Sequence, residues 1–282
     1  MNKKLRQILI SSFLLLFIGS SSIVLHHLHA QRKAAQIYET AADIALKQPE
    51  PLSAPAEDTL VSLPEPELPL AETPQPTPIP TPTPLPAEAA LLLDLDLAAL
   101  REVNADVFAW IYIPDTTISY PLLRSRDNQE YLNLTWDLQA SSSGSIFLER
   151  KNAVELTDFN TLIYGHNMKN GTMFSPLHQY KDQSFADTHP YVYIATGTSI
   201  LVYEVFSAYT ADVVSDTYLL YFEDSSRKEY AIDFFMNKSE IASSAVPSAD
   251  SRILTLSTCT GLGNYNYRWV VQAVLIHEFP LS

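Results

Sequence analysis

The sequence of 282 residues contains a single cysteine, Cys259. A chain with one cysteine forms no intramolecular disulfide, so an ordinary apolar core must hold the fold together. Apolar residues make up 46% of the sequence and include 15 Tyr and 12 Phe, which is sufficient for such a core. An isolated cysteine is most often a small buried apolar residue, so reactivity can be assigned to Cys259 only from its neighbours.

Positive charge is also scarce. The chain has 18 Lys and Arg against 32 Asp and Glu, a formal net charge of −14. A protein that binds nucleic acid needs a basic face for the phosphates. The composition therefore argues against a nucleic-acid partner.

Long apolar runs are absent except at the N-terminus, where three basic residues precede a run from Ile8 to about Leu25. This run of roughly 18 residues is just long enough to span a bilayer as a helix. Residues 1–30 are therefore predicted to be an uncleaved membrane anchor or a cleaved signal peptide. The anchor is favoured, because cleavage after Ala30 would place the bulky Leu28 where a small residue is needed. By the positive-inside rule, the remainder of a single-pass membrane protein would then be extracellular.

Proline is infrequent outside one segment. Residues 31–90 are predicted to form a short helix over QRKAAQIYETAADIALKQ, followed by an extended linker with 13 of the 19 prolines. Such a linker is largely polyproline II, and its reach is on the order of 100 Å. We expect it to hold the next domain away from a membrane, and a chain that begins near residue 91 to fold without it.

Residues 91–282 are predicted to form one mainly β domain. Segments such as NTLIYG, PYVYIAT, SILVYEVFSAYT, RILTLSTC and RWVVQAVLIHEF are rich in β-branched and aromatic residues. Gly197 and Thr198 predict a hairpin turn, and residues 223–246 predict a helical insertion. No helix clearly joins two strands, so a mainly antiparallel sheet or barrel with peripheral helices is expected. The helix predicted to begin this domain places three apolar residues on one face: Leu97, Leu100 and Val103.

The strand RILTLSTC ends at Cys259, and the strand RWVVQAVLI begins at Arg268. If these two strands pair as a hairpin, the side chains of Cys259 and Arg268 lie side by side. A fixed positive charge favours the thiolate, the nucleophilic form of a group whose free pKa is about 8.5. A guanidinium also has donors that can hold a carbonyl or an oxyanion. The structural alternative for Arg268 is a salt bridge at a strand end.

A thiol nucleophile also needs a group that moves protons. Three of the seven histidines lie at the predicted membrane border, and His277 lies in the last strand. His178 and His189 lie in a polar connection. His166, in NTLIYGHNMKNGTMF, directly follows a strand and a glycine, where a sheet can present a catalytic side chain. A lone histidine there is more often structural, but Cys, His and Arg at three strand ends together predict a cysteine acyl-transfer site.

These residues resemble the motifs of the sortase family, and specifically of class B sortases. LSTC with Arg268 downstream resembles the cysteine motif of the family, and YGHNM resembles its histidine motif. The block DVFAWIYIPDTTISYPLLRSRDNQEYLN is similar to the class B N-terminal region. The resemblance spans about residues 97–279. It implies an eight-stranded β-barrel with helices at its N-terminus and between the sixth and seventh strands.

The resemblance also implies a reaction, transpeptidation in the Gram-positive cell wall. Cys259 would attack the Thr carbonyl of a surface protein's sorting signal, NPQTN-like or related, and form a thioacyl-enzyme. An amine of a peptidoglycan precursor or pilin would then accept the acyl group. His166 would act as acid and then as base, and Arg268 would steady the substrate and the oxyanion. No metal or cofactor is expected.

Four further positions match the class B substrate groove, and the resemblance implies that they bind substrate: Asn128, Leu132, Tyr164 and Ser257. One departure lies after the cysteine. Thr260, Gly261 and Leu262 stand where some class B members have an acidic residue. The preferred sorting signal is therefore open.

Two functions from other classes are also compatible with parts of the sequence. A secreted cysteine peptidase would share the acyl-enzyme and differ only in using water as the acceptor. A non-catalytic surface-binding module would account for the N-terminal segment, the linker and the β-rich domain. Such a module would leave the combination of Cys259, His166 and Arg268 without a purpose.

Overall fold

The computed structural model describes residues 24–25, 28–46, 84–261 and 265–281. The predicted anchor or signal segment falls mainly on residues 1–23 and the Pro-rich linker mainly on residues 47–83, so both predictions lie largely outside the described residues. Within those described ranges, no helix combines the length and the apolar character needed to cross a membrane.

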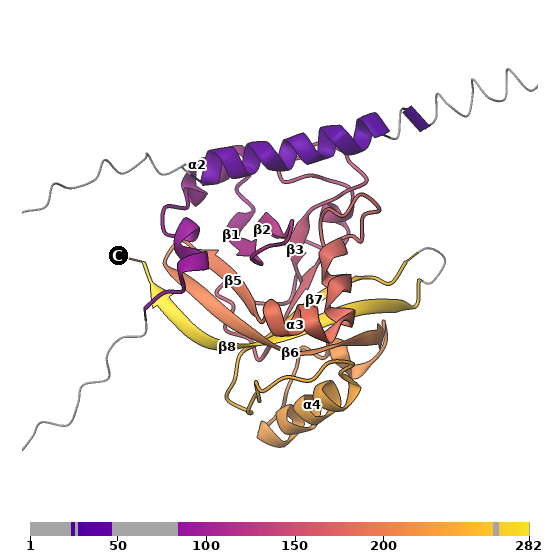
Figure 1. Ribbon diagram of the computed structural model, residues 1–282. Coiled ribbons are helices and arrows are strands. Elements are labelled where there is room, and N and C mark those ends of the chain that lie inside the picture. Colours follow the sequence, from indigo (N-terminus) through magenta and orange to yellow (C-terminus); the bar gives the residue numbers. More distant parts are fainter. Residues whose placement is uncertain (1–23, 26–27, 47–83, 262–264, 282) are drawn as a thin grey trace, which may run out of the picture.

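Eight strands close into a barrel, as predicted (Figure 1). Around the barrel the order is β1-β2-β3-β4-β7-β8-β6-β5, and β5 pairs with β1. The pairs β2–β3 and β4–β7 are parallel, and the other pairs are antiparallel. The bounds are β1 Val107–Tyr112, β2 Ser119–Arg124, β3 Ile146–Leu148, β4 Asn160–Tyr164, β5 Tyr191–Thr196, β6 Ser199–Asp212, β7 Ile253–Cys259 and β8 Tyr267–Pro280.

Side chains alternate between the two faces of β7, so one face of this strand packs in the core and the other can contribute to the site. Leu254 and Leu256 are fully buried in the main apolar core. Thr255 and Ser257 lie on the other face, where they are also covered. The hydroxyl of Thr255 donates to Asn160 Oδ1 at 2.7 Å, so its burial leaves no unpaired donor.

Short helices surround the barrel, and the predicted hairpin and helical insertion are confirmed. β5 and β6 form the hairpin over Gly197 and Thr198. α4 lies between β6 and β7 and buries Ala231 and Phe235 in a second, smaller core. The helical elements are η1 Ala87–Leu92, α2 Leu97–Val103, η2 Glu130–Leu132, η3 Ser175–Lys181, α3 Gln183–Thr188, η4 Asp216–Tyr218 and α4 Ser225–Lys238.

The predicted apolar face of α2 is correct at two of its three positions. Leu97 and Leu100 are buried, but Val103 is 47% exposed. Val103 is the last residue of this seven-residue helix. The chain leaves for β1 directly after it, so the helical period no longer points the Val103 side chain at the core.

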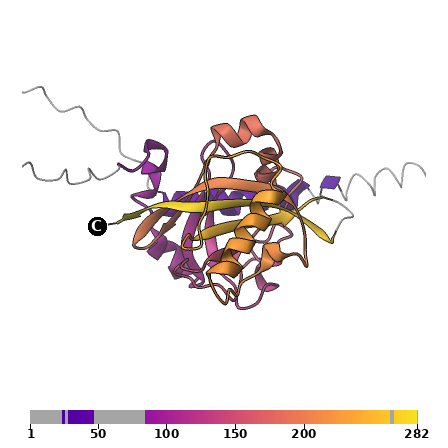
Figure 2. The same ribbon diagram turned by 90° about the horizontal axis from the view of Figure 1, so that it is seen from below.

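A helix over residues 28–45 lies along the barrel on the side opposite α4 (Figures 1 and 2). Its Ala41 and Ala45 are fully buried. The Tyr38 ring meets Tyr120 edge to face with centroids 5.2 Å apart, and its hydroxyl donates to the carbonyl of Gly144. The domain boundary at residue 91 stays a prediction, but these contacts make the helix part of one packed core.

We therefore expect a chain that begins near residue 91 to be less stable than one that begins at residue 28. Loss of a single buried aromatic side chain costs about 3–5 kcal/mol. For a domain of this size, about 3 kcal/mol corresponds to a fall in Tm of roughly 6–12 °C. Calorimetry should show such a fall when the chain is shortened from residue 28 to residue 91, and a similar fall for Tyr38→Ala. Equal melting temperatures for the two lengths would contradict this packing.

Candidate active site

Cys259 and Arg268 are direct cross-strand partners, as the hairpin interpretation predicted. Cys259 is the last residue of β7, and Arg268 is the second residue of β8. Directly opposed residues in an antiparallel pair have neighbouring side chains on the same face. Cys259 is half-buried and reduced. A guanidinium and a thiol are thus held together at one rim of the barrel.

His166 reaches the same rim because β4 and β7 run parallel. Tyr164, the last residue of β4, pairs with Ser257, and the two chains continue to His166 and Cys259. The residue between Tyr164 and His166 must be Gly165, since a Cβ there would lie 2.4 Å from Ile146 Cδ1 and 2.7 Å from the Phe174 ring. The glycine in the YGH motif therefore lets the chain turn close to the core.

The His166 ring is shared between the thiol and a backbone carbonyl. Its hydrogen bond with Cys259 raises the pKa of His166 above 6.5, the carbonyl of Leu132 adds to the rise, and burial opposes it. His166 Nε2 lies 2.8 Å from the Leu132 oxygen. A carbonyl only accepts, so Nε2 carries a proton here and Nδ1 is the other ring nitrogen available for proton transfer.

The pKa of the Cys259 thiol shifts in the opposite direction to that of His166. The hydrogen bond with His166 lowers the pKa of Cys259 below 9.0, burial opposes this, and the charges of Arg268 and His166 lower it further. A raised histidine pKa and a lowered cysteine pKa both favour the thiolate–imidazolium pair.

These opposite shifts predict the pH dependence of thiol alkylation. The rate for Cys259 with iodoacetamide should rise through an apparent pKa below that of a free thiol. In His166→Ala the rise should move to higher pH, because the principal contact that stabilises the thiolate is lost. Since the two groups titrate together, the measured values belong to the pair. His189→Ala is the control, because the His189 ring stacks on Phe185; an unchanged profile for His166→Ala would disprove the contact.

Arg268 also has contacts of its own. Its Nη1 donates to the carbonyl of Tyr265 at 2.9 Å and to that of Tyr267 at 3.0 Å. One end of the guanidinium thus holds the segment that precedes β8. The remaining donors of the planar group are available for a ligand at the thiol.

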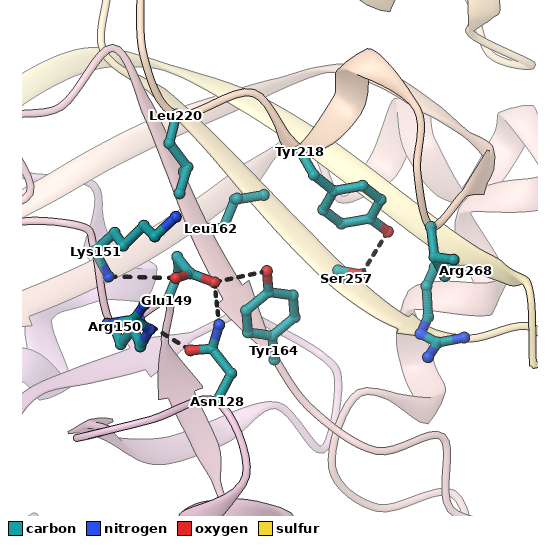
Figure 3. Close-up of a pocket in the computed structure, with 11 residues that line it drawn as sticks. Asn128, Glu149, Arg150, Lys151, Leu162, Tyr164, Tyr218, Leu220, Ser257 and Arg268 are labelled. Carbon is teal, nitrogen blue, oxygen red and sulfur yellow. Dashed lines mark hydrogen bonds between the residues drawn. The ribbon is translucent and has the colours of Figure 1, made fainter.

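A cavity of about 510 Å³ opens beside Arg268. Three of the four residues predicted to bind substrate line it: Asn128, Tyr164 and Ser257 (Figure 3). The fourth, Leu132, is not among the residues that line this cavity, and its carbonyl contacts His166 instead. The assignment of these four residues to a substrate groove stays a prediction; three of them share this cavity, and the carbonyl of Leu132 lies against the histidine.

Glu149 organises the cavity wall, and the sequence pattern did not reveal it. The side chain is 5% exposed. Its Oε2 accepts from Asn128 Nδ2 and, at 3.1 Å, from the Tyr164 hydroxyl, while Oε1 accepts from the backbone of Lys151 at 3.3 Å (Figure 3). Burial and the nearby Glu149 raise the pKa of Tyr164, so its phenol stays protonated.

Two other residues beside the site were also missed. Tyr218 lines the cavity and its hydroxyl lies 3.1 Å from Ser257 Oγ. His178, set aside in the sequence as part of a polar connection, lies with Nε2 2.9 Å from the carbonyl oxygen of Cys259. Among the residues described, no group of three or more His, Cys, Asp or Glu is arranged to hold a metal ion.

Comparison with known proteins agrees with this geometry. A family model for the sortase domain matches residues 111–276. Sortase B of Listeria monocytogenes is 36% identical over 183 residues, which cover 64% of this chain and 74% of that protein. Sortase B of Staphylococcus aureus is 32% identical over 161 residues, 57% of this chain and 66% of that one.

Solved structures give the same result. A Staphylococcus aureus sortase B–substrate complex superposes with a TM-score of 0.61 at 31% identity and covers 64% of this chain and 84% of its own. Clostridium perfringens sortase B superposes with a TM-score of 0.60 at 31% identity, covering 64% and 99%. The chain therefore belongs to the sortase family, and its relatives place it in class B.

Proposed function

We propose that this chain is a cysteine transpeptidase that attaches surface proteins to an amine of the cell wall. The observation that carries the proposal is the pairing of β4 with β7 and of β7 with β8, which brings His166, Cys259 and Arg268 to one rim of the barrel. Nucleophile, proton carrier and oxyanion donor are the three parts that an acyl transfer requires. Of the three, Arg268 lines the cavity of about 510 Å³, whereas Cys259 and His166 are not among its lining residues.

In the first half-reaction, the Cys259 thiolate adds to the Thr carbonyl carbon of a sorting signal. The carbonyl oxygen becomes an oxyanion, which the remaining donors of Arg268 would bind. When the C–N bond breaks, the imidazolium of His166 gives its proton to the departing amine. The products are a thioacyl-enzyme, a peptide with a new amino terminus and a neutral His166.

In the second half-reaction, an amine attacks the thioester carbon. Neutral His166 takes the proton that the attacking nitrogen loses, and the C–S bond breaks to restore the thiolate. The same pair of groups thus serves both directions. Water in place of the amine would give hydrolysis, and the residues alone do not distinguish these acceptors.

The substrates proposed are a sorting signal of the NPQTN-like or a related type and an amine of a peptidoglycan precursor or pilin. Asn128, Tyr164 and Ser257 would contact the signal. A similar structure is described as sortase B complexed with triglycine, which makes that peptide a suitable first acceptor to test. We also propose that residues 1–30 anchor the protein in the cell membrane, with the barrel in the extracellular cell-envelope space.

Intact-mass spectrometry tests the proposal directly. The protein is incubated with peptides carrying NPQTN-like, NPxTG-like or LPxTG-like signals, with and without triglycine. We expect one signal to give an acyl adduct on Cys259 and, with triglycine, a ligated product. Free acid as the sole product at saturating amine would indicate a peptidase, and no adduct with any signal would indicate a binding module.

A further inference from the structure

The chain neighbours of His166 and Arg268, and the backbone of Cys259 itself, meet at one side chain, that of His178. Asn167 follows His166 in the chain, and its Nδ2 lies 3.0 Å from His178 Nε2. Trp269 follows Arg268, and its ring stacks against the His178 ring with centroids 6.0 Å apart and planes 24° apart. The backbone oxygen of Cys259 completes the cluster.

The Cys259 carbonyl accepts from both polar side chains. Asn167 Nδ2 lies 3.0 Å and His178 Nε2 lies 2.9 Å from this oxygen. A carbonyl oxygen has two lone pairs, so it can accept both bonds at once. Donation by His178 requires its proton on Nε2, so the 3.0 Å approach of Asn167 Nδ2 to that nitrogen is a contact between two donors and not a hydrogen bond. Burial, together with the nearby charge of Lys181, lowers the pKa of His178, so the ring is held neutral.

The support behind His178 is rigid. Trp269 is fully buried, and its indole Nε1 donates to the carbonyl of Leu177 at 2.7 Å. Leu177 and His178 are neighbours within η3. The ammonium of Lys181 lies 4.9 Å from the centre of the Trp269 ring. The histidine is therefore presented by a short helix that is itself attached to β8.

This position matters because Cys259 is where β7 ends. Its pairing with Arg268 is the last of the β7–β8 ladder, and the chain then leaves as the connection to β8. A residue at a strand end lacks a following ladder bond to fix its backbone. The two side-chain donors replace that constraint on the residue that carries the sulfur.

We propose that Asn167 and His178 are positioning residues that clamp the Cys259 carbonyl and so hold the thiol within reach of His166. His166 and Asn167 are consecutive residues. Asn167 therefore holds the backbone of Cys259, while His166 lies at its side chain. The expected effect of this clamp on the rate of acyl-enzyme formation rests on the proposed function. Its expected effect on the pKa of the Cys259 thiol is independent of that function.

Three variants separate the parts of the clamp. Asn167→Asp keeps the shape but places an acceptor against the carbonyl. His178→Phe keeps an aromatic ring against Trp269 and removes the donor, while His178→Gln keeps an amide donor and removes the ring. His189→Phe is the matched control, because its ring also stacks on an aromatic residue, Phe185, in the adjoining α3 region.

Two readouts are needed, the pH profile of Cys259 alkylation and the single-turnover rate of acyl-enzyme formation. We expect Asn167→Asp and His178→Phe to raise the thiol pKa and to slow acylation by about tenfold to a hundredfold, since misplacement of a reacting group by about 1 Å costs about a hundredfold. Substrate KM should change little. His178→Gln should recover most of the rate, and the effects should not add in the double variant, because both donors share one acceptor.

The clamp is overturned if Asn167→Asp and His178→Phe lower Tm while the folded protein keeps the wild-type thiol pKa. It is equally overturned if His178→Gln is no better than His178→Phe, because the donor would then be irrelevant. Failure of the wild type to form an acyl-enzyme with any peptide would reject the proposed function instead. The alkylation profiles would still test the clamp in that case, since they need no substrate.

Discussion

Replacing Cys259 by alanine should abolish both peptide cleavage and the acyl adduct in intact-mass spectra. The chain has no second thiol that could take over the reaction. His166→Ala should be nearly as damaging, because the histidine both lowers the pKa of the thiol and supplies the proton for the leaving amine. We expect losses of at least about a thousandfold for both variants, since members of a catalytic unit fail together.

The control for these variants is Thr188→Ala, an exposed residue at the end of α3 whose hydroxyl bonds back to the carbonyl of Ser184 at 2.9 Å. Its cleavage rate should stay within about twofold of wild type, an effect well below that of losing one catalytic donor. The melting temperature of Cys259→Ala should remain close to that of wild type, which excludes unfolding as the cause. Full turnover by Cys259→Ala would end the transpeptidase proposal.

Arg268→Lys should lose at least about a hundredfold in acyl-enzyme formation, the typical cost of removing one oxyanion donor. The guanidinium already uses Nη1 to hold two carbonyls, those of Tyr265 and Tyr267. Lysine presents its three donors from one nitrogen, so it lacks the planar fork that can hold this segment at one end and an oxyanion at the other. The thiol pKa should change little, because the His166 contact has the larger influence on it.

Two measurements on one protein decide between the roles of Arg268. Single-turnover cleavage gives the rate, and the pH dependence of alkylation gives the acidity of Cys259. If Arg268→Lys shows a strongly raised thiol pKa and recovers its rate at high pH, charge and not the arrangement of donors is what matters. Arg252→Lys is a suitable control, since that arginine pairs with Glu278 on the outer barrel.

That Cys259, His166 and Arg268 lie at one rim was predictable because each position is fixed by local pattern, while their catalytic roles stay proposals. Cys259 and Arg268 follow from two strands joined by a short connection, and His166 follows from a strand that ends in glycine. Glu149 was not predictable in this way. Its contact with Tyr164 depends on the pairing of β3 with β4, and the short strand Ile146–Leu148 gives no periodic signal. His178 likewise becomes significant only when η3 packs on Trp269.

The packed N-terminal helix shows a signal that was available and not used. Ala34, Tyr38, Ala41 and Ala45 are all buried, and they recur at intervals of four and three residues. That spacing is typical of one helix face against a core. The many prolines that follow predict a segment without a packed core, but they say nothing about the apolar face of the helix before them. The two parallel strand pairs were not predictable either, because the partners are far apart in the sequence.

The parallel pairing of β4 with β7 also determines when the nucleophile becomes reactive. Asn167 and Cys259 are separated by 92 positions, and β5, β6 and α4 lie between them. Contacts of such long range form late, because the loop between them must first be ordered. Until the barrel closes, the sulfur lacks its imidazole partner and keeps the acidity of a free thiol. Cys259 in an incompletely folded chain should thus react slowly with alkylating reagents. The time at which its fast reaction appears during refolding would report the last stage of folding.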